Sequence, residues 1–182
     1  MRHLIIGGAR SGKSALAETL ARRSGQPVSY IATGVPADDE MARRIAHHRA
    51  RRPADWPTVE APLRLAAALA AHAAPGRTLI VDCLTLWISN WIAGPGDDDS
   101  IADLGAYTSE REALLDALPR LAGDVVLVAN EVGSGIVPIG RLSRIFTDEA
   151  GRLNQDVAAR CERVTLVVAG QPLILKAPAP DR

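Results

Sequence analysis

Aromatic side chains are scarce in this sequence: one Phe, two Tyr and three Trp together make up 3% of the 182 residues. Hydrophobic residues still amount to 47%, so a core built from this chain must be packed mainly with Ala, Leu, Val and Ile. Net charge is absent as well, because 21 Lys and Arg balance 21 Asp and Glu. The composition therefore predicts a globular domain with a sizeable aliphatic core, and it excludes a general nucleic-acid or membrane surface.

Cysteine and long apolar runs are equally sparse. The two cysteines, Cys83 and Cys161, lack the spacing of a metal site or a disulfide framework, and their apolar neighbours predict buried thiols. No apolar run approaches the roughly 18 residues that a membrane span needs, and the first residues enter a strand directly, which leaves no room for a signal peptide. We therefore expect a cytoplasmic protein with no membrane span.

The most informative stretch lies near the start of the chain, at residues 4–14, and reads LIIGGARSGKS. It matches the spacing G-x-x-x-x-G-K-[ST] of a phosphate-binding loop (P-loop) through Gly7, Gly12, Lys13 and Ser14. An apolar run precedes the motif and residues 15–21 are strong helix formers, so the motif lies between a strand and a helix. In such a loop Lys13 contacts the β- and γ-phosphates and the Ser14 hydroxyl holds Mg²⁺. The stretch predicts a nucleoside triphosphate site.

Other predicted strands end in residues suited to the same site. Residues 28–33 form a strand followed by Gly34, residues 78–82 form one that closes on Asp82, and residues 125–129 form one that leads into Asn130. The carboxyl ends of parallel strands meet at one edge of a sheet, where ligands bind. An apolar strand closed by Asp is typical of the second acidic element of P-loop enzymes, so we expect the Asp82 carboxylate to reach Mg²⁺ directly or through water.

A predicted helix over residues 39–50 carries the adjacent pair His47 and His48. Neighbouring helical residues point about 100° apart, so the two imidazoles have different surroundings. Arginines are dense here, with Arg43, Arg44, Arg49, Arg51 and Arg52 close in sequence. Arginine binds phosphates through paired N–H donors, and a neutral imidazole in a cationic pocket can attack phosphorus. From these residues alone, a functional and a purely structural histidine pair both remain open.

Strand and helix patterns alternate along the whole chain, with further helices predicted over residues 63–74, 84–92, 101–121 and 141–159 and a last strand over residues 164–169. This alternation predicts an α/β fold: a single P-loop NTPase-like domain with a mostly parallel sheet and helices on both faces. We place this nucleotide-binding catalytic domain at residues 1–176 and a loose tail at residues 177–182. The acidic stretch 94–100 is expected to be a solvated connector, and Trp87 and Trp91 are expected to pack in the core.

Several unusual stretches occur in one order: residues 7–14, 30–33, 39–49, 81–85, 130–138 and 151–155. Together they closely resemble the bifunctional adenosylcobinamide kinase / adenosylcobinamide-phosphate guanylyltransferase of cobalamin biosynthesis, over about residues 4–168. The double histidine and the Asn-Glu-Val-Gly stretch are specific, whereas the P-loop is generic. The resemblance implies phosphorylation of adenosylcobinamide with ATP or GTP. It further implies transfer of GMP from GTP to adenosylcobinamide phosphate through a guanylylated histidine, which gives adenosylcobinamide-GDP and pyrophosphate, in a homotrimer.

The resemblance also implies roles for individual residues. The guanylylated residue is one of His47 and His48, and we favour His48 because it directly precedes the arginine-rich stretch. Lys13 is the third catalytic residue, and Ser14 and Asp82 are the metal residues. Some relatives carry Glu at position 82, and either acid can bind Mg²⁺. The nucleotide-binding residues are Gly7, Gly8, Ala9, Arg10, Ser11, Gly12, Lys13, Ser14, Gly34, Val35, Pro36, Arg49, Ala50, Arg51, Arg52, Glu60 and Asp82.

Two other functions fit the same motifs. A P-loop small-molecule kinase without a covalent intermediate would leave both histidines structural. A P-loop regulatory switch or ATPase module would act through a partner and would need no substrate pocket. Retention of label from α-labelled GTP on the protein distinguishes the covalent mechanism from the plain kinase, and nucleotide-dependent partner binding without corrinoid turnover would indicate the regulatory module.

Overall fold

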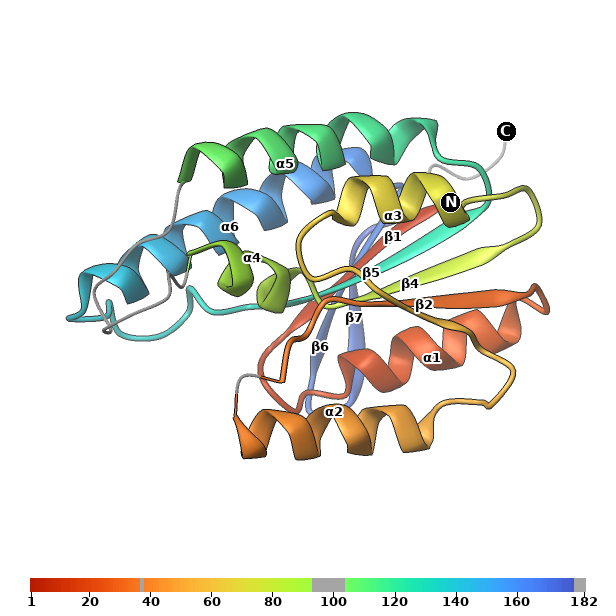
Figure 1. The fold of residues 1–182 in the computed structure, drawn as a ribbon, viewed down its shortest axis with the longest axis horizontal. Coiled ribbons are helices and arrows are strands. Elements are labelled where there is room, and N and C mark those ends of the chain that lie inside the picture. Colours follow the sequence, from red (N-terminus) through yellow and green to blue (C-terminus); the bar gives the residue numbers. More distant parts are fainter. Residues whose placement is uncertain (37, 93–103, 179–182) are drawn as a thin grey trace.

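The structure, a computed structural model, describes all residues except 37, 93–103 and 179–182 (Figure 1). Within the described residues one seven-stranded sheet runs through the molecule in the order β3-β2-β4-β5-β1-β6-β7. All neighbouring strands are parallel except β6 and β7, so the predicted mostly parallel α/β fold is confirmed. The strands are β1 (Arg2–Gly7), β2 (Val28–Ala32), β3 (Thr58–Glu60), β4 (Thr78–Asp82), β5 (Asp124–Asn130), β6 (Arg163–Val168) and β7 (Gln171–Lys176).

Helices cover both faces of this sheet. Helices α1 and α2 lie against one face, and α3, α4, α5 and α6 lie against the other (Figure 1). The acidic stretch 94–100 and the predicted start of the fifth helix fall outside the described residues. The described helices are α1 (Lys13–Arg23), α2 (Asp39–Arg51), α3 (Leu65–His72), α4 (Leu84–Ile92), α5 (Leu104–Ala117) and α6 (Arg141–Arg160), with a short 3₁₀ turn, η1 (Leu118–Arg120), after α5.

The last strand, β7, was missed by the sequence patterns. It turns back from β6 through Ala169 and Gly170, which both have positive φ (50° and 77°), and it pairs antiparallel with β6. A two-residue turn with positive φ at both positions gives the twist that a tight hairpin needs, but Ala is an unusual residue there. Every residue of β7 is exposed, so the strand has no buried side to produce an alternating pattern. The Gly170 N–H donates to the Ser11 carbonyl (2.8 Å), so this hairpin also supports the P-loop.

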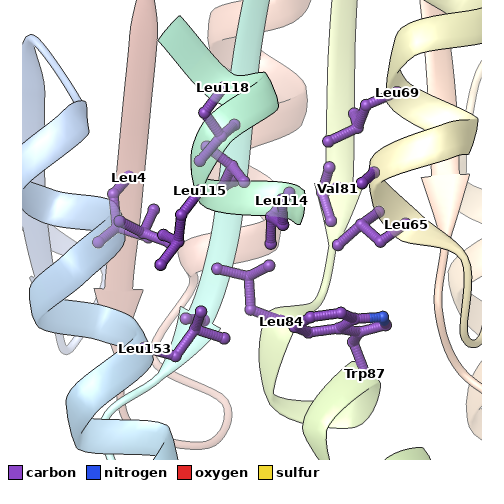
Figure 2. Close-up of a cluster of buried hydrophobic side chains, with 14 of the residues drawn as sticks. Leu4, Leu65, Leu69, Val81, Leu84, Trp87, Leu114, Leu115, Leu118 and Leu153 are labelled. Carbon is purple, nitrogen blue, oxygen red and sulfur yellow. The ribbon is translucent and has the colours of Figure 1, made fainter. Parts of the chain in front are cut away.

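The larger core cluster lies between the sheet and the helices α3 to α6, and it is aliphatic as the composition predicts. Figure 2 shows leucines from several elements around Val81 and the large aromatic ring of Trp87. Trp87 is fully buried and its indole N–H donates to the Leu63 carbonyl (2.8 Å). Trp91 packs at the margin of this cluster, and both cysteines are buried, as expected. None of the described helices is long and apolar enough to cross a membrane.

Candidate active site

The carboxyl ends of β1, β2, β4 and β5 meet at one edge of the sheet, and the residues after them surround a cavity of about 650 Å³. This volume lies within the roughly 300–1,000 Å³ that is usual for small-molecule sites. Three parts of the chain form its walls: the P-loop, helix α2 and the strand ends. The lining includes Ala9, Arg10, Gly12, Lys13, Ser14, Gly34, Arg43, His47, His48, Arg49, Arg52, Thr58, Glu60, Asp82 and Asn130.

The P-loop connects β1 to α1 in a tight curl. Arg10 and Gly12 both have positive φ (57° and 99°), and Gly12 is the N-cap residue of α1. Lys13 begins the helix, is 8% exposed, and donates from its ammonium group to the Gly8 carbonyl (3.1 Å). A cation, a helix N-terminus and a glycine-rich backbone therefore converge at one wall, which is the arrangement that binds phosphate groups.

Helix α2 forms the opposite wall and brings the histidines to the cavity. It begins after Asp38, whose carboxylate accepts a hydrogen bond from the Met41 N–H (2.7 Å). Acidic residues in the first turn stabilise the helix further through their attraction to the positive end of the helix dipole. Both His47 and His48 line the cavity, with ring centroids 6.4 Å apart. Because they are successive helical residues, only one of them can face the floor of the site.

That residue is His48. Its Nδ1 lies 3.9 Å from Oδ2 of Asp82, whereas the His47 side chain is exposed. The Asp82 side chain is only 13% exposed, so the contact is partly shielded from water. An imidazole whose Nδ1 faces a carboxylate presents Nε2 on its opposite side. The structure therefore places at the carboxylate the histidine that we favour from its position before the arginine-rich stretch.

Asp82 is held in turn by Tyr30 on the neighbouring strand. Tyr30 is 1% exposed, and its hydroxyl donates to Asp82 Oδ2. The Arg52 guanidinium carbon lies 3.3 Å from the centroid of the Tyr30 ring. Burial, and then the Asp82 charge, raise the Tyr30 pKa, so this hydroxyl stays protonated and acts as a donor.

Cys83 also lines the cavity, directly after Asp82. Its thiol is buried, and burial together with the Asp82 charge raises the Cys83 pKa to about 11. The thiolate is the nucleophilic form of cysteine, so this side chain is unreactive near neutral pH. Among the described lining residues, the histidines are therefore better suited than the thiol to form a covalent intermediate.

A second, smaller pocket of about 540 Å³ continues from the first one between α2 and β3. Arg49 donates to the Glu60 carboxylate (3.2 Å) at its rim, where both side chains are largely exposed. Most of the other lining groups are apolar or backbone, which suits a flat ring system bordered by a few polar groups. The lining consists of Gly34, Pro36, Ala42, Ile45, Ala46, Arg49, Ala50 and Glu60.

The two pockets contain most of the site residues that the sequence predicts. Gly7, Gly8 and Ser11 belong to the P-loop without contributing to the lining, and Val35 is 44% exposed beside it. Arg51 is the last residue of α2, and its side chain falls outside the described part of the structure.

Sequence reasoning missed Tyr30, although that residue belongs to one of the diagnostic stretches. Tyr30 lies two residues before Ala32, which is paired with Asp82, so strand alternation places Tyr30 and Asp82 on the same face of the sheet. That pairing depends on the order of the strands. The contact between Tyr30 and Asp82 could therefore be predicted only if β2 were known to lie beside β4.

Comparison with solved structures supports the fold independently. The chain aligns with a solved ATPase domain at a TM-score of 0.53 and 15% identity, covering 97% of this chain and 76% of that one. It also aligns with an ATPase from the type III secretion system of pathogenic bacteria at a TM-score of 0.53 and 12% identity, covering 91% of this chain and 51% of that one. These identities are low, so the likeness shows the P-loop NTPase fold alone.

Sequence comparison is more specific. The chain is 58% identical over 176 residues to the bifunctional adenosylcobalamin biosynthesis protein CobP of Pseudomonas aeruginosa, covering 97% of this chain and 98% of the relative. It is 46% identical over 176 residues to the bifunctional adenosylcobalamin biosynthesis protein CobU of Escherichia coli, covering 93% and 97%. The family described as cobinamide kinase / cobinamide phosphate guanyltransferase matches residues 3–175. The chain therefore belongs to the cobinamide kinase / cobinamide phosphate guanyltransferase family.

Proposed function

We propose that this chain carries out both reactions of its family in the one cavity described above. It phosphorylates adenosylcobinamide with ATP or GTP, and it then transfers GMP from GTP to adenosylcobinamide phosphate, giving adenosylcobinamide-GDP and pyrophosphate. One observation carries the proposal beyond family membership: His48 and the P-loop line the same cavity, with His48 Nδ1 3.9 Å from Asp82. A nucleotide held by the P-loop is thereby within reach of a nucleophile.

The kinase step needs positioning and charge compensation more than covalent chemistry. The P-loop backbone and Lys13 hold the β- and γ-phosphates, so that the γ-phosphorus faces the substrate hydroxyl. Arginines on α2 and just after it contribute further positive charge from the opposite wall, because Arg43, Arg49 and Arg52 line the cavity. The hydroxyl oxygen bonds to the γ-phosphorus and loses its proton to solvent, the bond to the β-phosphate oxygen breaks, and the nucleoside diphosphate leaves with the electron pair.

The donor set in the cavity fits Mg²⁺. Ser14 offers a hydroxyl and Asp82 a carboxylate, both hard oxygen donors, and no cluster of three or more His, Cys, Asp or Glu occurs among the described residues. Mg²⁺ is usually held by one or two carboxylates plus phosphates and waters rather than by a cage of protein ligands, so this sparse set is appropriate. When bound, Mg²⁺ neutralises charge on the phosphates.

Guanylyl transfer uses His48 as the nucleophile. Its Nε2 lone pair forms a bond to the α-phosphorus of GTP, the bond from that phosphorus to the bridging oxygen breaks, and pyrophosphate leaves with the electron pair. The proton on Nδ1 stays on the ring, facing the Asp82 carboxylate. A phosphate oxygen of adenosylcobinamide phosphate then attacks the same phosphorus, the P–N bond breaks, and His48 returns to its neutral form.

The pocket between α2 and β3 is the proposed place for the guanosine part of the nucleotide. Gly34, Pro36, Ala50 and Glu60 line it, and Val35 adjoins it. Guanine presents N–H donors on one edge, which a carboxylate such as that of Glu60 can accept. Arg49 and Arg52 would then lie near the phosphates, while the role of Arg51 stays a prediction from the resemblance.

The test separates the two activities with paired variants. His48→Ala should keep phosphorylation of adenosylcobinamide, fail to retain label from α-labelled GTP, and make no adenosylcobinamide-GDP. His47→Ala is the matched control on the same helix and should retain the label. Label on His48→Ala but not on His47→Ala would reverse the assignment within the pair. Normal labelling and normal guanylyl transfer by both variants would show that the histidine mechanism is wrong.

The quaternary structure and cellular location are also proposals. Subunit association is supported by the apolar residues exposed on the edge strand β7, where Leu173, Ile174 and Leu175 are each more than half exposed, and the number of three subunits is taken from the resemblance. Burial of such side chains is a common source of subunit association. Light scattering of the purified chain measures the subunit number. We propose a cytoplasmic location because the substrates are nucleotides, and cell fractionation tests it.

A further inference from the structure

The helix that carries the proposed nucleophile is held to the sheet by few contacts. None of the α2 side chains that the structure describes is buried, in contrast with α1, four of whose residues are buried. The end of α2 is linked to the sheet by polar contacts: His48 to Asp82, Arg49 to Glu60, and Arg52 to the Tyr30 ring. The orientation of His48 therefore depends on a small number of side chains.

Tyr30 contacts two of these links at once. Its hydroxyl donates to Oδ2 of Asp82, the same oxygen that lies 3.9 Å from His48 Nδ1. The guanidinium of Arg52 stacks on its ring and also donates to the Thr58 hydroxyl (3.5 Å). Arg52 is the residue directly after α2. The ring lies in the core beneath α1 and is 1% exposed, so the hydroxyl has a fixed position.

We propose that Tyr30 is a positioning residue for guanylyl transfer, and that its hydroxyl fixes the Asp82 carboxylate in the orientation that sets the His48 ring. Rotation of an aspartate about its terminal bond costs little, so an unrestrained carboxylate can turn Oδ2 away from the imidazole. The hydrogen bond from the buried Tyr30 hydroxyl opposes that rotation, because turning Oδ2 away would break it. With Oδ2 fixed, the imidazole holds its N–H toward the carboxylate, and Nε2 points into the cavity toward the α-phosphorus. This inference rests on the proposed function of His48.

The kinase step makes a weaker demand on the same hydroxyl. Asp82 serves both steps as a proposed Mg²⁺ residue, so any loss that acts through the metal is common to both. The kinase step needs no protein nucleophile, so the orientation of His48 enters guanylyl transfer alone. Loss of the Tyr30 hydroxyl should therefore lower the rate constant for labelling by α-labelled GTP more than the rate constant for phosphorylation of adenosylcobinamide. The ratio of the two rate constants is independent of the fraction of folded enzyme, so it distinguishes positioning from a general loss of stability.

Tyr30→Phe removes the hydroxyl and keeps the ring that Arg52 covers. We expect a single-turnover labelling rate constant lower by on the order of ten-fold at saturating GTP, because a hydrogen bond to a charged group is lost, with little change in the GTP concentration that gives half-saturation. Tyr107→Phe is the matched control: Tyr107 is equally buried at 1% exposure, packs against Trp87, and its hydroxyl has no hydrogen-bond partner among the described residues. Tyr107→Phe should label at the wild-type rate.

A double-mutant cycle tests whether Tyr30 acts through Asp82. In an Asp82→Ala background the hydroxyl has no carboxylate to orient, so adding Tyr30→Phe should change the labelling rate constant by less than about two-fold. Equal labelling-to-phosphorylation ratios for wild type and Tyr30→Phe would overturn the inference, as would losses that multiply in the double variant. If the wild-type protein retains no label, the proposed guanylylated histidine is wrong. If the wild type labels normally and Tyr30→Phe labels at the same rate, only the positioning role of Tyr30 is wrong.

Discussion

Gly7→Ala should destabilise the fold much more than Gly8→Ala, although the two glycines are adjacent in the P-loop. A Cβ at Gly7 would lie 2.5 Å from the Val167 carbonyl oxygen and 2.6 Å from Ser11 Oγ, whereas no heavy atom lies within 4 Å of a Cβ at Gly8. Val167 is the β6 residue paired with Gly7, so its carbonyl can move only if the β1–β6 ladder shifts. The clash therefore falls on backbone that has little freedom to relax.

The size of the effect follows from this difference. Overpacking of a well-packed site costs about 1–3 kcal/mol, and for a domain of this size each kcal/mol lowers the melting temperature by roughly 2–4 °C. We therefore expect Gly7→Ala to melt roughly 2–12 °C below the wild type. Gly8→Ala has open space and should stay within about 0.5 kcal/mol of the wild type.

The assay is thermal and urea unfolding of both variants without nucleotide, since either methyl group would also approach bound phosphates. Unchanged urea m-values would show that the denatured state is unaffected. Equal melting temperatures for Gly7→Ala and wild type would refute the packing argument, and a large loss in Gly8→Ala would show that the loop tolerates no side chain for some other reason.

Lys13→Ala should lower both activities on the order of 10²–10³-fold, because each reaction needs phosphates held in the P-loop; near-normal turnover at saturating GTP would contradict a shared site. His3 gives a pH dependence of stability: burial, and then the Arg163 charge, lower its pKa to about 4 from the ordinary 6.5, and its Nε2 is 2.8 Å from the Thr165 hydroxyl. The unfolded chain takes up this proton at higher pH than the folded chain, so the stabilisation is complete above about pH 6.5 and is lost as the pH falls toward 4, by up to about 3 kcal/mol. Urea unfolding at pH 7 and pH 4.5 should show a smaller loss for His3→Gln than for the wild type, and equal losses would show that His3 is not the group responsible.

The sequence by itself determined the local elements that carry the chemistry. Local patterns predict three of them: the P-loop, the strand that ends at Asp82, and the helix that carries His47 and His48. They can do so because motif spacing, apolar runs and capping residues are local properties of the chain. The parallel α/β arrangement also follows from the alternation of strands and helices, and the comparisons confirm both the fold and the family. The assignment of individual site residues stays a prediction.

Strands and helices without a buried face could not be predicted from local sequence patterns. The exposed strand β7 lacks an alternating pattern, and its hairpin turn places Ala169 at positive φ. Gly151 lies in the interior of α6, and the helix continues through it. A single glycine costs about 1 kcal/mol in a helix interior, which packing of the rest of the helix offsets.

The tertiary structure alone decided which histidine faces the carboxylate and what holds that carboxylate. The sequence favours His48 only by its position before the arginines, whereas its contact with Asp82 depends on how α2 lies relative to the end of β4. Tyr30 and Asp82 are 52 positions apart in sequence and meet because β2 pairs with β4. Contacts of this kind depend on strand order and helix placement, which are set by long-range packing and leave no periodic signal in the chain.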